Sequence, residues 1–234
     1  MTLVVITIGG FVRGLTGFGG GMVMAPVLSL LLGPQQAVAI SLGLESFAVL
    51  PLLRPAMRTA HWTVMRPIII AAFIGAPVGG ILMVLLAPAT MRNLIAGAVI
   101  VSAAAMLAGF RYHGPQRTGT SVAVGFAGGV LVSATSMGGP PVIVYLMAGS
   151  DPPQVTRANL MVYATICAMA GLIALGMTGI LSVSWALLVI ILAPFYILST
   201  YAGCAFFSYI NEQYFRRFIL LFMIAVSAGV VIFS

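Results

Sequence analysis

The stretch Gly14-Leu-Thr-Gly-Phe-Gly-Gly-Gly21 interrupts a long apolar segment, residues 3–32, near its centre. A second stretch, Ser136-Met-Gly-Gly-Pro-Pro141, interrupts residues 119–149 in the same way. Each segment has about 30 residues, whereas one membrane crossing takes about 20 residues. Each segment therefore has two interpretations. It is either one long kinked helix or a hairpin of two half-helices, each about 12 residues long and half a membrane deep.

The two breaks belong to an internal repeat with a constant offset of 119 residues, which relates residues 5–53 to residues 124–172. Glycine, proline and threonine positions recur where backbone geometry is demanding: Gly9 and Gly10 align with Gly128 and Gly129, Thr16 with Thr135, Gly19 and Gly20 with Gly138 and Gly139, and Pro34 with Pro153. Duplicated halves in so apolar a chain are typical of transporters. We expect one integral membrane domain made of a first repeat (1–110), a linker (111–117) and a second repeat (118–234).

Composition places the chain in a membrane. It is 62% hydrophobic and 6% charged, with a mean hydropathy of +1.19, which a soluble domain of this size could not cover with polar surface. After each broken segment we expect three plain helices, at 36–53, 66–87 and 91–109 in the first half and at 156–176, 184–208 and 215–233 in the second. The net charge of +7 comes from ten scattered arginines without a basic, aromatic-rich stripe, which argues against nucleic-acid binding.

The arginines separate the kinked-helix interpretation from the hairpin interpretation. If all eight segments cross, five arginines face four across the membrane, and no orientation is favoured. If both broken segments are hairpins, eight arginines share one side and only Arg92 faces them, as the positive-inside rule expects. Three crossings per half then make the halves inverted repeats. Residues 54–66 and 111–117 become cytoplasmic, and both termini face away from the cytoplasm.

The two breaks are also the best candidate for a binding site. Non-helical backbone at membrane depth is tolerated where it is buried in protein or lines a wet cavity. A half-helix begins after each glycine run, so free N–H groups and positive dipole ends point at the break and favour an anion. The alternative is that the glycines only allow close helix packing. The candidate substrate-binding residues are Arg13, Thr16, Gly17, Phe18, Gly19, Gly20, Gly21, Thr135, Ser136, Met137, Gly138, Gly139, Pro140 and Asn159.

Glu45 is the only acid within a hydrophobic run. An ionised carboxylate at membrane depth is costly, so we expect it to be paired, protonated or in water. Either it couples proton movement to transport, or it forms a salt bridge with Arg13 that silences both charges. Arg13 is correspondingly an anion ligand or a counter-ion. Asn159 either binds substrate or joins helices, and Arg157 is expected to be a topology charge facing lipid headgroups.

The string from Gly14 to Leu28, with Gly33-Pro-Gln-Gln-Ala-Val-Ala-Ile-Ser-Leu42, resembles the TauE/SafE family of sulfite and organosulfonate exporters. Its marks are a G-x-G-G-G run, a following proline and a helix that opens on small residues. Ser136–Pro141 with Pro153–Asn159 is similar to the family's second motif. The resemblance covers essentially the whole chain. It implies a multi-pass transporter of the prokaryotic cytoplasmic membrane, with sulfite, an organosulfonate or a related carboxylate as substrate. The sequence departs from the pattern at Pro140, Arg13 and Glu45.

Other functional classes have little support in the sequence. It holds no GK[ST] phosphate loop and no Ser/His/Asp arrangement or carboxylate pair at membrane depth, so we expect a non-enzyme without cofactor or metal. His61 and His113 lie in predicted loops, and Asp151 marks a helix boundary. The expected partners are a small anion, the lipid bilayer, H⁺ as a coupling ion and, as a possibility, a second copy in a homodimer. A non-transporting scaffold or assembly factor and a passive anion channel are the alternatives.

Overall fold

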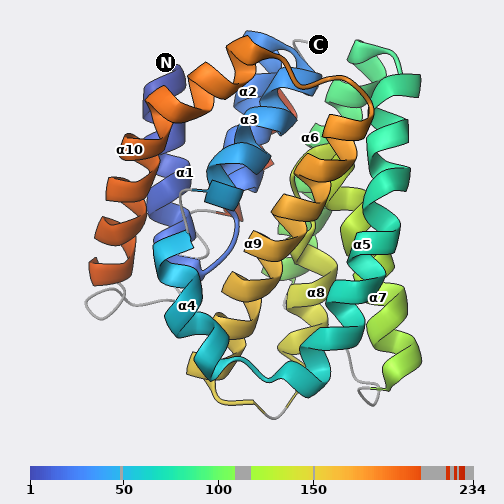
Figure 1. The fold of residues 1–234 in the computed structure, drawn as a ribbon, viewed down its shortest axis with the longest axis vertical. Helices are drawn as coiled ribbons and strands as arrows, with labels where there is room; N and C mark the ends of the chain where they lie inside the picture. Colours follow the sequence, from blue (N-terminus) through green and yellow to red (C-terminus); the bar gives the residue numbers. More distant parts are fainter. Residues whose placement is uncertain are drawn as a thin grey trace.

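The computed structural model describes residues 1–47, 50–108, 117–149, 151–206, 220–221, 224–225 and 227–229. This part of the chain is built of helices and contains no strand (Figure 1). In chain order the helices are α1 (Thr2–Thr16), α2 (Gly20–Leu32), α3 (Pro34–Phe47), α4 (Leu50–Thr59), α5 (Trp62–Leu85), α6 (Pro88–Leu107), α7 (Thr118–Thr135), α8 (Gly139–Leu146), α9 (Pro153–Met177) and α10 (Val183–Phe206). The predicted linker except Arg117, and most of the predicted helix 215–233, lie outside the described residues.

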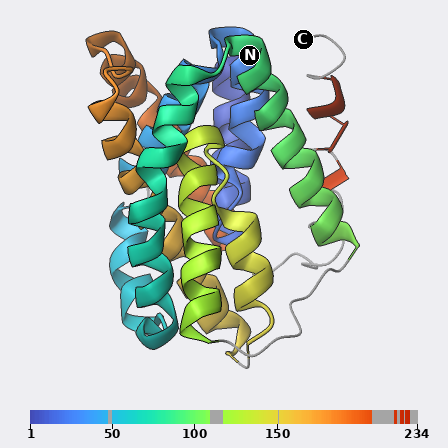
Figure 2. The ribbon, with the colours of Figure 1, turned by 90° about the vertical axis from the view of Figure 1, so that its right-hand side faces the viewer.

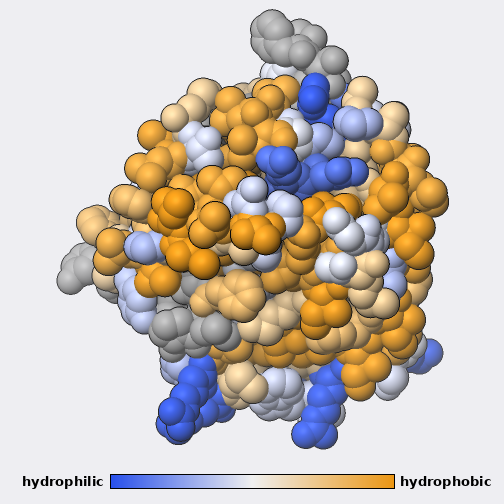
Figure 3. Space-filling model, turned by 45° about the horizontal axis from the view of Figure 1, so that its top comes forward, coloured by the Kyte–Doolittle hydropathy of each residue, from blue (hydrophilic) through white to orange (hydrophobic). Residues whose placement is uncertain are grey.

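Five of the described helices are long and apolar enough to cross a membrane: α5, α6, α7, α9 and α10. Large apolar side chains point outward from them, including Ile74, Ile190 and Leu198, each more than 60% exposed. Figure 3 shows apolar residues over most of one face, with hydrophilic residues gathered toward its upper end and its lower edge. The predicted all-α membrane protein is confirmed.

The first break separates α1 from α2. Gly17 ends α1 with φ 80° and Gly19 precedes α2 with φ 85°, a left-handed conformation that glycine adopts without steric cost. The chain then folds back, so that Gly9 of α1 lies against Met24 and the backbone of Gly20. Residues 3–32 therefore form two helices packed side by side and not one kinked helix.

The second break repeats this arrangement between α7 and α8. Ser136, the counterpart of Gly17 in the repeat, ends α7 with φ 60°, and Gly128 of α7 lies against Gly138 at the start of α8. The lengths differ from the expected 12 residues, because α1 has 15, α2 has 13, α7 has 18 and α8 has 8. α8 ends at Leu146, and residues 147–149 turn before Pro152 caps α9.

The helix predicted at 36–53 is wrong in its extent. The structure has α3 ending at Phe47 and α4 running from Leu50 to Thr59, through part of the predicted loop 54–66. Helical backbone therefore continues past the predicted end at residue 53, as far as Thr59. In the second repeat, α9 is helical for 25 residues and ends at Met177.

The helices form a bundle in which α9 occupies the centre and contacts α3, α4, α5 and α7. α1 packs along α10 on one flank, and α5 packs along α7 on the other. Figures 1 and 2 place the α1–α2 pair toward the end that holds the N-terminus and the α7–α8 pair toward the opposite end. The carboxyl end of α1 and the carboxyl end of α7 therefore both point into the middle of the bundle.

Candidate functional site

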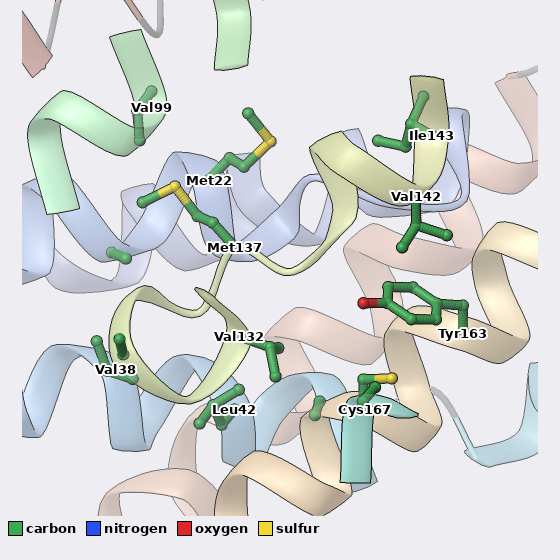
Figure 4. Packing of buried hydrophobic residues seen from close by; sticks show 14 of the residues in the cluster. Met22, Val38, Leu42, Val99, Val132, Met137, Val142, Ile143, Tyr163 and Cys167 are labelled. Atoms are coloured by element: carbon green, nitrogen blue, oxygen red, sulfur yellow. The ribbon is translucent and has the colours of Figure 1, made fainter. Parts of the chain in front are cut away.

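The two helix breaks meet in the middle of the bundle. A side chain at Gly21, in the first turn of α2, would collide with the Ser136 carbonyl and would lie 2.7 Å from the Ser136 Oγ. Only glycine allows this approach of the two backbones. Met22, which follows the first break, and Met137, which lies within the second, are next to each other in Figure 4. Sequence segments 115 residues apart thus form one site.

The two threonines of the repeat have matching roles. The Thr16 hydroxyl donates to the Val12 carbonyl at 2.9 Å, and the Thr135 hydroxyl donates to the Leu131 carbonyl at 2.7 Å. Thr16 also accepts a hydrogen bond from the Phe18 N–H at 3.3 Å. Both hydroxyls therefore bond to the ends of α1 and α7, and neither is in the wall of the central cavity.

Arg13 and Glu45 lie together at the first break. Arg13 is fully buried, Glu45 is 4% exposed, and the distance from Arg13 Nη1 to Glu45 Oε2 is 3.9 Å. Arg13 Nη2 donates to the Thr165 hydroxyl of α9 at 2.9 Å, and the Gly21 N–H donates to Glu45 Oε1 at 2.7 Å. Arg13 Nε and Nη1 and the Ser136 Oγ are buried without a hydrogen-bond partner. This is an ion pair whose guanidinium keeps unused donors.

These groups border a small cavity of about 20 Å³, which has room for one water-sized molecule. Nine of the residues proposed from the sequence line it: Arg13, Phe18, Gly19, Gly21, Glu45, Ser136, Met137, Gly138 and Gly139. A guanidinium, a serine hydroxyl and the N-terminus of α2 face it, and these are the groups that hold an oxyanion in proteins. Glu45 contributes the only negative charge among its lining residues.

Sequence reasoning missed four residues of the cavity wall: Met22, Val132, Tyr163 and Ala164. Tyr163 is fully buried in α9, and its hydroxyl donates to the Gly138 carbonyl at 3.1 Å (Figure 4). The sequence held one signal that could have identified Tyr163. In the repeat it aligns with the residue next to Glu45, and a phenol at membrane depth needs a polar partner.

The structure does not bring Asn159 to the cavity. Its side-chain oxygen accepts the His61 N–H at 2.7 Å, and its amide group donates to Asp151 Oδ2 at 3.3 Å. His61 Nδ1 lies 3.0 Å from Asp151 Oδ1. We call His61, Asp151 and Asn159 the polar clasp. It joins the α4–α5 connection to the start of α9, and the sequence indicated neither the contact between His61 and Asp151 nor the role of Asp151.

The expectation that Arg157 faces lipid headgroups is wrong. Its side chain is partly buried and donates from Nη2 to the Gly14 carbonyl at 2.5 Å, beside Gly17. The carbonyls at the carboxyl end of a helix lack intrahelical partners and carry negative partial charge, which attracts a guanidinium. Gly20 lies beside the Tyr196 hydroxyl, and Pro140 lines a separate apolar groove between α6 and α7.

Comparison with known proteins gives one match. The family model described as "Sulfite exporter TauE/SafE" matches residues 2–230 of the 234 residues. No curated protein and no solved structure matches the chain. Within the described residues, no group of three or more His, Cys, Asp or Glu side chains is placed to hold a metal ion.

Proposed function

The chain belongs to the TauE/SafE family of sulfite exporters, and from this premise we propose that it is a secondary active transporter of a small anion. The substrate is sulfite, an organosulfonate or a related carboxylate. The anion binds at the meeting point of the two breaks and crosses the membrane by alternating access. Protonation of Glu45 couples its movement to the proton gradient.

The observation that carries this proposal is the buried guanidinium of Arg13. A fully buried arginine at membrane depth costs free energy, and such residues mark substrate and ion pathways. Two of its nitrogen atoms have no hydrogen-bond partner, and the unpartnered Ser136 hydroxyl borders the same cavity. An oxyanion placed there would accept hydrogen bonds from these groups and from N–H groups in the first turn of α2.

Two features support an inverted repeat. The α1–α2 and α7–α8 pairs lie toward opposite ends of the bundle (Figures 1 and 2), and the positions Gly17 and Ser136, 119 residues apart, both end their helix in left-handed backbone. The exposed arginines Arg54, Arg58 and Arg66 lie near the α4–α5 connection at the lower end in Figure 1. The positive-inside rule then makes this end cytoplasmic.

The test is uptake into proteoliposomes across a panel of sulfite, alkanesulfonates and carboxylates, with and without a pH gradient. We expect saturable uptake of at least one class. Ser136→Gly removes the cavity hydroxyl in a backbone conformation that glycine accepts, and it should raise KM. Ser41→Ala is the matched control, because the Ser41 hydroxyl is also buried without a partner but lies outside the cavity wall.

Absence of uptake of every anion by folded protein would overturn the transporter and favour a scaffold. Uptake that rises linearly with anion concentration would indicate a passive channel. The cavity of about 20 Å³ argues against an open pore, because an anion of sulfite size does not fit without movement of the walls.

A further inference from the structure

The carboxylate of Glu45 occupies the position that suits a bound anion. Oε1 accepts the N–H of Gly21 in the first turn of α2, and Oε2 faces Arg13 Nη1 at 3.9 Å. The two groups that would hold a substrate anion, the helix N-terminus and the guanidinium, are thus already turned to a resident carboxylate. Glu45 is 4% exposed, so water does not screen it.

The surroundings of Glu45 balance this single negative charge with a single positive one. Four helices contribute groups near Glu45. α1 contributes Arg13, α2 contributes its N-terminus, and α9 contributes the Tyr163 phenol at the cavity wall. α7 ends there at Ser136. From α10, the Tyr196 hydroxyl and Glu45 Oε1 both lie within 3 Å of the point where a Gly20 side chain would begin. α6 carries one charged residue, Arg92, near its N-terminal end. Among the described residues, Arg13 is therefore the one ion-pair partner of Glu45.

A second anion cannot join this arrangement while Glu45 is ionised. Glu45 Oε1 already accepts the Gly21 N–H and Oε2 already faces Arg13 Nη1, so an anion that binds to these two groups must displace the carboxylate. An ionised carboxylate displaced into a buried site, beside a like charge, is unfavourable. A protonated Glu45 carries no charge, releases Arg13 and can donate a hydrogen bond to the incoming oxyanion.

We propose that Glu45 is a built-in competitor of the substrate, so that the anion binds only with a proton on Glu45 and the two cross the membrane together as a symport pair. The inference rests on the proposed function. The balance is one proton for each anion: H⁺ joins the Glu45 carboxylate on the side of entry and leaves it on the side of release. For a monovalent anion the cycle is electroneutral. Proton binding and anion binding then strengthen each other, and the proposal predicts cotransport of anion and proton in the same direction, not exchange of one for the other.

The experiment loads proteoliposomes with a pH dye and clamps the membrane potential at zero with potassium and valinomycin. Methanesulfonate is the probe, because it stays ionised throughout and carries no proton itself. Inward uptake should acidify the lumen by one proton per anion. Uptake with an alkaline lumen, or with no pH change, overturns the symport while leaving the transporter intact. No uptake of any anion overturns the proposed function itself.

Binding supplies a second readout that does not depend on transport. In detergent, the affinity for methanesulfonate should weaken by about tenfold for each unit by which the pH rises, over the range where Glu45 is ionised. The reason is that one proton is bound with each anion. Glu45→Gln imitates the protonated acid, so it should bind across the whole range with a flat pH profile and transport without acidifying the lumen. Glu45→Asp keeps a titrating carboxylate and should keep the slope. A flat wild-type profile, or a Glu45→Gln profile as steep as the wild type, overturns the competition.

Discussion

Removing either member of the Arg13–Glu45 pair should destabilise the protein, and the loss in the double variant should be smaller than the sum of the two single losses. At the observed 3.9 Å and an effective dielectric constant of about 20, the attraction is worth about 4 kcal/mol. Arg13→Met leaves the carboxylate buried without its partner, and Glu45→Gln leaves the guanidinium in that state, each costing about 3–5 kcal/mol. Arg13→Met also removes the hydrogen bond to Thr165, a further loss of about 1.5–3 kcal/mol.

The assay is thermal unfolding in detergent, followed by size-exclusion chromatography of the heated samples. At about 2–4 °C per kcal/mol, Glu45→Gln should melt about 6–20 °C below the wild type, and Arg13→Met about 9–32 °C below it. The double variant Arg13→Met with Glu45→Gln should recover about 4 kcal/mol relative to the sum of the two losses. Arg92→Met is the matched control, since Arg92 has no ion pair among the described residues. An interaction energy within about 0.5 kcal/mol of zero would refute the pairing.

Three further outcomes test other parts of the structure. Gly21→Ala should abolish folding or transport because its side chain collides with the Ser136 carbonyl, whereas Gly97→Ala, which meets open space, should fold normally in the same expression assay. Asn159→Ala should lower thermal stability by about 1–3 kcal/mol, because the His61 N–H loses its acceptor; an unchanged melting temperature would show that the polar clasp does not stabilise the fold. A reporter active only in the cytoplasm, fused to the carboxyl end, should be silent, and a bright reporter would contradict the proposed topology.

The architecture around the breaks was accessible from sequence because it depends on local chemistry. Glycines and prolines inside an apolar segment dictate where a helix must end, and the repeat shows that this happens twice. The charges of Arg13 and Glu45 were also identifiable, since a charge at membrane depth requires a partner. The structure then shows that these two charges face each other and share the cavity with Ser136.

The remaining contacts depend on how helices rotate and pack, which a repeat pattern does not specify. Arg157 turns inward to the Gly14 carbonyl, 143 residues earlier in the chain, although its position near a helix start suggested the headgroups. His61 and Asp151 are 90 residues apart, and each looked like an ordinary loop residue. Helical backbone also continues in α4 as far as Thr59, past the end at residue 53 that the repeat pattern predicted.

The polar clasp makes the two faces of the bundle unequal. The positions 119 residues before Asp151 and Asn159 are Leu32 and Ile40, whose side chains cannot form hydrogen bonds. If the two repeats were identical, the two access states of the proposed transporter would be equally populated at rest. A clasp that stabilises one access state changes the ratio of the two populations by tenfold for about every 1.4 kcal/mol that it contributes. Its loss should therefore change how long the protein dwells in each state, without changing the intrinsic affinity of either state for the anion.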